Sequence, residues 1–135
     1  MNSKITSLLK ASFTFICLFL LSNSLLAQTA LVTNDTGCDM EVTIYGTDDC
    51  GSIECSQTQI VAANTTQNIS LPCKSNVVYA EVTADCTTSP ILELETPGCH
   101  CGGATTDNDT FTIGMWTVTA TSTCSGSSVT IDITD

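Results

Sequence analysis

Met40-Glu-Val-Thr-Ile44 alternates apolar and polar residues, and Val129-Thr-Ile-Asp-Ile-Thr134 repeats the pattern near the C-terminus. Shorter versions occur in segments 78–84 and 92–95. Successive side chains of a β-strand point to opposite faces, so this alternation is typical of strands with one buried face and one solvated face. No segment spaces its apolar residues as a helix would over three turns. We therefore predict an all-β chain.

The strands expected from this pattern are short, and turn signals separate them roughly every 8–12 residues. Examples of these signals are Gly46-Thr-Asp-Asp49, Ala63-Asn-Thr65 and Ser125-Gly126. Many short strands at this spacing predict a sandwich or a barrel. We expect an antiparallel two-sheet sandwich of immunoglobulin-like character, with about seven to eight strands and held together by disulfides.

The segment from Asp109 to Ala120 changes its parity. Its apolar residues fall into two sets of opposite parity: Phe111, Ile113 and Met115, and then Trp116, Val118 and Ala120. One flat strand cannot present both sets to the same core. A bulge near Gly114 would switch the buried face, because glycine tolerates the required backbone. We predict a bent or bulged long strand with Trp116 in the core.

The N-terminus has the features of a secretory signal peptide. Lys4 and Lys10 precede an apolar run from Phe13 to Leu21, and Ala27 supplies a small residue for cleavage. The run is shorter than the ~20 residues that span a bilayer, so we expect no membrane span once the leader is removed. We expect residues 1–27 to be the signal peptide and residues 28–135 to be a single β-sandwich domain. The domain is expected to be secreted or displayed at the cell surface, with the periplasm as an alternative.

The exported part is rich in cysteine. Of nine cysteines, Cys17 lies in the leader, and the eight that remain are Cys38, Cys50, Cys55, Cys73, Cys86, Cys99, Cys101 and Cys124. An even number in a small exported chain predicts a disulfide framework. The expected strand order suggests these pairings: Cys38 with Cys86 or Cys124, and Cys73 with Cys99 or Cys101. A local bridge from Cys50 to Cys55 is permitted if their Cα atoms lie within about 7 Å.

The exported part is strongly acidic. Lys4 and Lys10 leave with the leader, so Lys74 is its one basic residue against fourteen acids, which gives a formal charge of 1 − 14 = −13. Nucleic acids and anionic membranes require basic patches, so we exclude both as partners. The charge suits a cationic partner, a divalent metal or simple solvation. We expect an extracellular ligand or protein that the sequence does not identify, with self-association as an alternative.

Two stretches resemble a known class of protein. They are Val32-Thr-Asn-Asp-Thr-Gly-Cys-Asp-Met-Glu-Val-Thr-Ile-Tyr45 and Ile60-Val-Ala-Ala-Asn-Thr-Thr-Gln-Asn-Ile-Ser-Leu-Pro72. Together they look like the opening of small secreted cysteine-rich bacterial β-sandwich proteins of unassigned function. The resemblance covers the first half of the exported part and implies a fold. It carries no catalytic residue.

Cys99-His100-Cys101 is the densest reactive cluster, and thiolate with imidazole is a zinc ligand set. A redox role is an alternative. Zinc motifs usually supply two close cysteine pairs, however, and exported thiols tend to oxidise, so we expect structural disulfides. His100 is the only histidine, and no serine or threonine is marked as a nucleophile that it would serve. We expect no catalytic residue, no enzymatic activity and no cofactor.

Three further patterns have a structural and a functional interpretation. Asp107 and Asp109 supply oxygen ligands of the kind that calcium takes, although the full calcium-loop pattern is missing, so the entry we favour is no metal. The threonines at every second position from Thr117 to Thr123 resemble the rows of some ice-binding proteins. Those proteins repeat the row over several neighbouring coils, whereas this sequence has one, so we expect an exposed strand face. Glycosylation sequons occur at Asn34, Asn64, Asn68 and Asn108.

Three functions follow in order. The first is a secreted or cell-surface, non-enzymatic binding or structural module. The second is a subunit of an extracellular fibre, in which the arm from Gln28 to Thr33 adds to the sheet edge of a neighbour. The third is a small metal-binding or hydrolytic protein.

Overall fold

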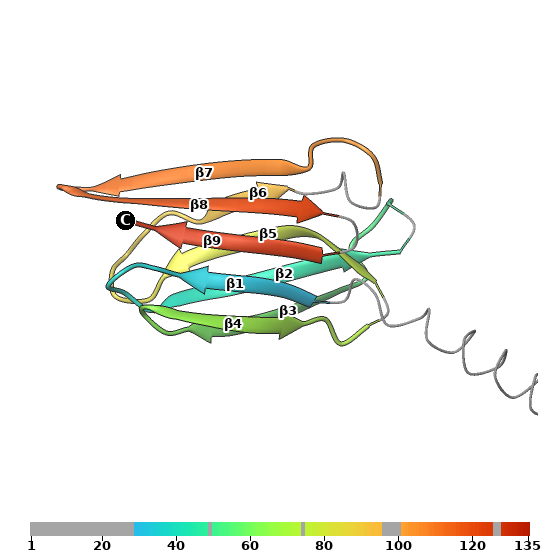
Figure 1. Cartoon of the computed structure of the whole chain (residues 1–135), viewed down its shortest axis with the longest axis horizontal. Coiled ribbons are helices and arrows are strands. Elements are labelled where there is room, and N and C mark those ends of the chain that lie inside the picture. Colours follow the sequence, from blue (N-terminus) through green and yellow to red (C-terminus); the bar gives the residue numbers. More distant parts are fainter. Residues whose placement is uncertain (1–28, 49, 74, 96–100, 126–127) are drawn as a thin grey trace, which may run out of the picture.

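The computed structural model describes residues 29–48, 50–73, 75–95, 101–125 and 128–135. These residues form an all-β structure of nine strands, as the alternation predicts (Figure 1). No helix within these ranges has the length and the apolar character needed to cross a membrane. The expected leader, residues 1–27, lies outside the described residues.

The strands form two sheets. The five-stranded sheet has the order β4-β1-β9-β8-β7. Its strands are β1 (Thr29–Asn34), β4 (Thr65–Ser70), β7 (Thr106–Ile113), β8 (Trp116–Ser125) and β9 (Ser128–Thr134). The four-stranded sheet has the order β3-β2-β5-β6. Its strands are β2 (Met40–Thr47), β3 (Cys55–Val61), β5 (Asn76–Ala84) and β6 (Leu92–Glu95). Neighbouring strands are antiparallel, except that β1 and β9 are parallel.

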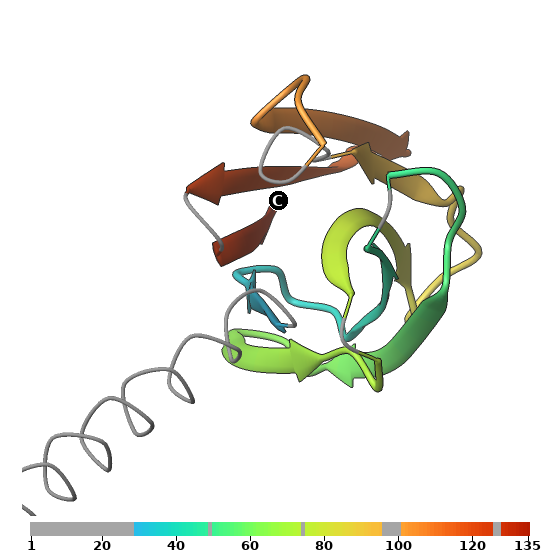
Figure 2. The ribbon, with the colours of Figure 1, turned by 90° about the vertical axis from the view of Figure 1, so that its right-hand side faces the viewer.

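One hydrophobic core lies between the two sheets, which curve toward each other in an end-on view (Figure 2). Met40, Val42 and Ile44 of β2 are completely buried, as the alternation predicts. Ile131 and Ile133 of β9 are equally buried from the opposite sheet. Burying each such side chain stabilises the fold by about 1.5–3 kcal/mol, so the alternating strands supply most of its hydrophobic stabilisation.

The predicted bulged long strand is wrong. β7 and β8 form a hairpin in which Ile113 pairs with Trp116, and Gly114 in the connection has a φ of 66°. Glycine adopts this conformation without strain. The reversal places Phe111 opposite Val118, so residues of opposite parity face the same core. The hairpin divides one expected strand into two, and this contributes to a count of nine where about seven to eight were expected.

A bulge does occur, but in the other sheet. The pairing of β2 with β5 shifts between Tyr45 and Gly46, so Tyr45 lies opposite Tyr79 and Gly46 opposite Val77. Val78 is thus the extra residue, and Val77 joins the hydrophobic core at this point. A Cβ on Gly46 would collide with the Leu71 side chain and would lie 3.1 Å from the Ser75 Cβ. The close packing therefore requires glycine.

Three disulfides join described residues, with these partners and Cα separations: Cys38 and Cys86 at 5.8 Å, Cys50 and Cys101 at 5.5 Å, and Cys55 and Cys73 at 6.2 Å. The predicted pairing of Cys38 with Cys86 is confirmed. The pairing of Cys73 with Cys99 or Cys101 is wrong, and so is the local Cys50–Cys55 bridge. Cys124 is also disulfide-bonded, with a partner outside the described residues.

The hairpin explains why the cysteine positions were misjudged. An unbroken strand would carry Cys124 to the end of the molecule where Cys38 and Cys86 lie. Because the chain reverses at Gly114, Trp116 reaches that end, and Cys124 lies at the far end of β8 (Figure 1). The disulfides indicate that the chain folds in an oxidising compartment.

Candidate functional site

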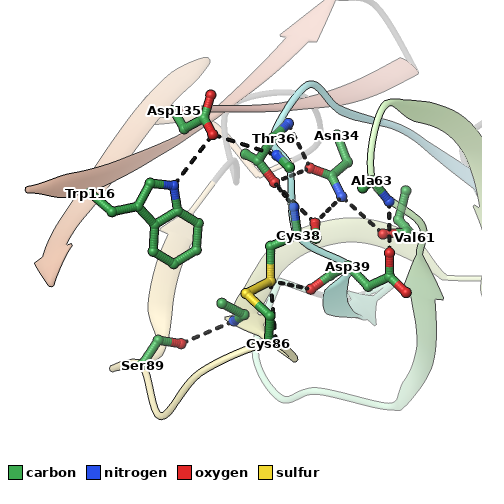
Figure 3. The surroundings of a disulfide bond; sticks show 12 residues. Asn34, Thr36, Cys38, Asp39, Val61, Ala63, Cys86, Ser89, Trp116 and Asp135 are labelled. Atoms are coloured by element: carbon green, nitrogen blue, oxygen red, sulfur yellow. Dashed lines mark hydrogen bonds between the residues drawn. A yellow bond between two sulfur atoms is a disulfide. The ribbon is translucent and has the colours of Figure 1, made fainter.

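The β1–β2 loop carries Cys38 from one sheet to the other, and buried Asn34 holds it in place (Figure 3). The Asn34 Nδ2 donates hydrogen bonds to the Cys38 carbonyl at 2.8 Å and to the Val61 carbonyl of β3 at 3.0 Å. Its Oδ1 accepts the Thr36 backbone N–H at 3.1 Å. Asn34 and Thr36 are both fully buried. One amide therefore connects β1, the loop and the edge of the second sheet.

This arrangement changes the interpretation of the first sequon. The Asn34 side chain is inaccessible and its nitrogen is already bonded twice, so the folded domain presents no glycan acceptor there. Asn64, Asn68 and Asn108 are exposed. The signal at Asn34 is therefore the hydrogen-bonding capacity of a buried amide.

A hollow of about 270 Å³ opens beside this loop, lined by Gly37, Cys38, Cys86, Thr87 and Trp116. The indole and the Cys38–Cys86 disulfide flank the hollow from opposite sides (Figure 3). The lining contains no carboxylate, amine or imidazole. The hollow is smaller than most ligand cavities, so it suits one group of a larger ligand.

Trp116 is half-buried, and not in the centre of the core as the sequence predicted. Its ring meets Phe111 edge to face, with 5.6 Å between centroids. Its Nε1 donates to the Asp135 Oδ2 at 3.3 Å, and the same oxygen accepts the Gly37 N–H at 3.5 Å. The terminal residue thus ties the indole to the loop, and part of the ring stays available at the surface.

A second surface lies on the outer face of the four-stranded sheet, where Tyr45 and Tyr79 meet with 5.3 Å between ring centroids. The Tyr45 hydroxyl donates to the Glu81 Oε2 at 2.6 Å. This hydrogen bond, with burial and the charge of Glu81, raises the pKa of Tyr45 to about 12. Burial raises the pKa of Tyr79 to about 12, and the charges of Glu93 and Glu81 add to the effect. Both phenols are neutral donors at neutral pH.

Asp107 and Asp109, the residues considered for calcium, extend from β7 to the edge of β6. The Asp107 Oδ2 accepts the Glu95 N–H at 2.9 Å, and the Asp109 Oδ2 accepts the Glu93 N–H at 3.1 Å. The second oxygen of each carboxylate accepts the N–H of the next residue. The two aspartates thus cover the exposed N–H groups of an edge strand. The described residues contain no group of three metal-type ligands, and calcium binding stays untested.

The Cys99-His100-Cys101 cluster is only partly within view. Cys101 is bonded to Cys50, which leaves it no thiolate for a metal. Cys99 and His100 lie outside the described residues, as does Lys74. Sequence reasoning missed the tyrosine pair and the hollow, because both depend on which strands become neighbours. The tyrosines had one usable signal, since each lies at an outward position of an alternating strand.

No family model matches the sequence, and searches of the curated proteins and of the solved structures found no match.

Proposed function

We propose that the exported chain is a non-enzymatic binding module, and that the hollow beside Trp116 holds an uncharged, partly apolar group of an extracellular ligand. The observation that carries this proposal is the pairing of an accessible indole with a disulfide across a hollow without ionisable groups. Tryptophan offers a large apolar surface at low entropic cost, which is why it is enriched among residues that dominate binding energies.

Rigidity of the hollow supports the proposal. The Cys38–Cys86 bond fixes one wall, the Asn34 hydrogen bonds hold the loop that carries Cys38, and Asp135 positions the indole. A preformed site loses less conformational entropy when a ligand binds. These residues come from loops and strand ends, where binding sites often lie on a rigid scaffold.

We further propose secretion or display at the cell surface, following cleavage of residues 1–27. The immunoglobulin-like character expected from the strand spacing also stays a proposal. It rests on two packed sheets of short strands, whereas a constant-type immunoglobulin domain has seven strands in sheets of four and three.

The fibre alternative needs a free N-terminal arm. Residues Thr29–Asn34 form β1, which pairs with β4 on one side and β9 on the other. Donation to a neighbour would require β1 to leave its own sheet. The edge of β6 is meanwhile covered by Asp107 and Asp109. Neither observation favours strand addition, so the binding module is the better proposal.

Trp116 is the single tryptophan, so its fluorescence reports directly on the hollow. Two uncharged probes, methyl β-glucopyranoside and benzyl alcohol, are titrated into the exported domain. We expect a saturating change in emission with at least one probe, and loss of saturation in Thr87→Arg, which fills the hollow. Thr88→Arg is the matched control, because Thr88 is exposed and lies outside the lining. Non-saturating quenching by both probes, or an unchanged response in Thr87→Arg, contradicts the proposal.

A further inference from the structure

The β7–β8 hairpin brings a second row of hydroxyls beside the threonines that the sequence shows on β8. The directly opposed pairs on its outer side are Thr106 with Thr123, Asn108 with Thr121, Thr110 with Thr119, and Thr112 with Thr117. β9 adds a third row, in which Thr130 lies opposite Thr123 and Thr134 opposite Thr119. We call these outward residues of β7, β8 and β9, together with Asp132, the threonine face.

The threonine face is almost uncharged, although the exported chain carries a formal charge of −13 (1 − 14). Asp132 is the one ionisable residue among its described positions. The acids of β7, Asp107 and Asp109, belong to the opposite side of that strand and bond to β6. The chain thus keeps charge away from a broad side of the five-stranded sheet.

The hydroxyls of the threonine face are regularly spaced. Alternate residues of a strand repeat roughly every 6.6 Å, and neighbouring strands lie about 4.7–4.9 Å apart. Hydroxyl pairs approach across the hairpin, at 3.1 Å between Thr110 and Thr119 and at 3.1 Å between Thr112 and Thr117. Threonine is also stiff at χ1 because it is β-branched. The result is a two-dimensional array of methyl and hydroxyl groups held by the sheet.

We propose that the threonine face is an ice-binding surface. Its two repeats are close to the spacings of oxygen atoms on a prism face of hexagonal ice. The hydroxyls hydrogen-bond to lattice waters, while the methyl groups restrict the orientation of the waters between them. The near absence of charge complements a neutral lattice, because a carboxylate would impose its own hydration shell. This activity is independent of the Trp116 hollow.

The same features disfavour other occupants. A crystalline polysaccharide is usually bound by aromatic rings that stack on sugars, and the described threonine face has none. A second copy of the chain would need an apolar or aromatic centre of the kind found in protein interfaces. Ice is the neutral, periodic partner that the array fits.

The test uses the exported domain with its disulfides intact, and measures thermal hysteresis and the shape of single ice crystals. We expect the native domain to depress the freezing point below the melting point and to produce faceted crystals. Thr119→Tyr, in the middle of the face, should lose both effects. Thr43→Tyr is the matched control, because Thr43 is also an outward strand threonine, with its hydroxyl 2.8 Å from that of Thr58. It should keep native activity.

A second matched pair guards against misfolding. Thr110→Lys places a charge on the threonine face, and Thr58→Lys places one on the outer side of the four-stranded sheet, with both native side chains exposed. Thermal melting confirms that each variant folds. Native-like activity in folded Thr119→Tyr and Thr110→Lys would overturn the proposal. So would a native domain without thermal hysteresis or crystal shaping, including one that instead binds crystalline cellulose or chitin in a Thr119-dependent way.

Discussion

Replacing Asn34 with alanine removes the amide that connects β1, the β1–β2 loop and the edge of the second sheet. The carbonyls of Cys38 and Val61 lose a donor, and the Thr36 N–H loses its acceptor. A buried group left without its partner costs about 1–3 kcal/mol. The Thr36 hydroxyl, 3.0 Å from the Cys38 carbonyl, compensates for part of this loss. We therefore expect the free energy of unfolding to fall by about 2–4 kcal/mol, a large share of the ~5–15 kcal/mol of a usual domain.

Urea unfolding of the disulfide-intact protein measures this change, as a lower midpoint at unchanged denaturant dependence. Asn68→Ala is the matched control, because Asn68 is an exposed strand asparagine, and its effect should stay within about 0.5 kcal/mol. A loss at Asn34 no larger than at Asn68 would refute the argument. It would mean that water or the loop itself satisfies the freed groups.

Three other predictions concern the tyrosine pair, the bulge and the covered edge. Tyr45 and Tyr79 have folded pKa values of about 12 against about 10 in the unfolded chain, so the unfolded state loses its protons first. Their contribution to stability is complete below about pH 10 and is lost toward pH 12, which denaturation at stepped alkaline pH measures; a constant stability through this window would contradict it. Gly46→Ala forces a methyl group against Leu71 and should cost about 1–3 kcal/mol in thermal unfolding, whereas Gly37→Ala, with open space around it, should not; equal effects would reject the packing argument. Asp109→Ala exposes the Glu93 N–H and should speed its hydrogen exchange relative to Asp132→Ala, and an unchanged rate would show that the carboxylate does not protect the edge.

Local pattern and tertiary geometry were not equally visible in the sequence. Alternation identified the buried faces of β2 and β9, because a strand with one solvated side repeats every two residues. The parity change between Phe111 and Trp116 was a true signal with two solutions, a bulge or a tight reversal. Alternation within a segment cannot choose between them, since both bring the two sets to one face. The wrong choice then moved Cys124 to the wrong end of the molecule.

The candidate sites depended on neighbours that are distant in the sequence. Asn34 was noted as a sequon, but its role depends on Val61, which lies in the other sheet. Asp107 and Asp109 were noted as oxygen ligands, yet their partners are backbone groups of β6. The threonines of β8 were visible as one row, and only the hairpin placed the row of β7 beside them. Each case required a strand register that composition does not determine.

The disulfide frame is the central claim, and one measurement tests it most directly. Trypsin cuts the exported domain after Lys74, and non-reducing mass spectrometry weighs the product. Cys38–Cys86 and Cys50–Cys101 both cross the cut, so residues 28–74 and 75–135 should remain one linked species that separates on reduction. Two separate fragments without reductant would show that neither bond exists.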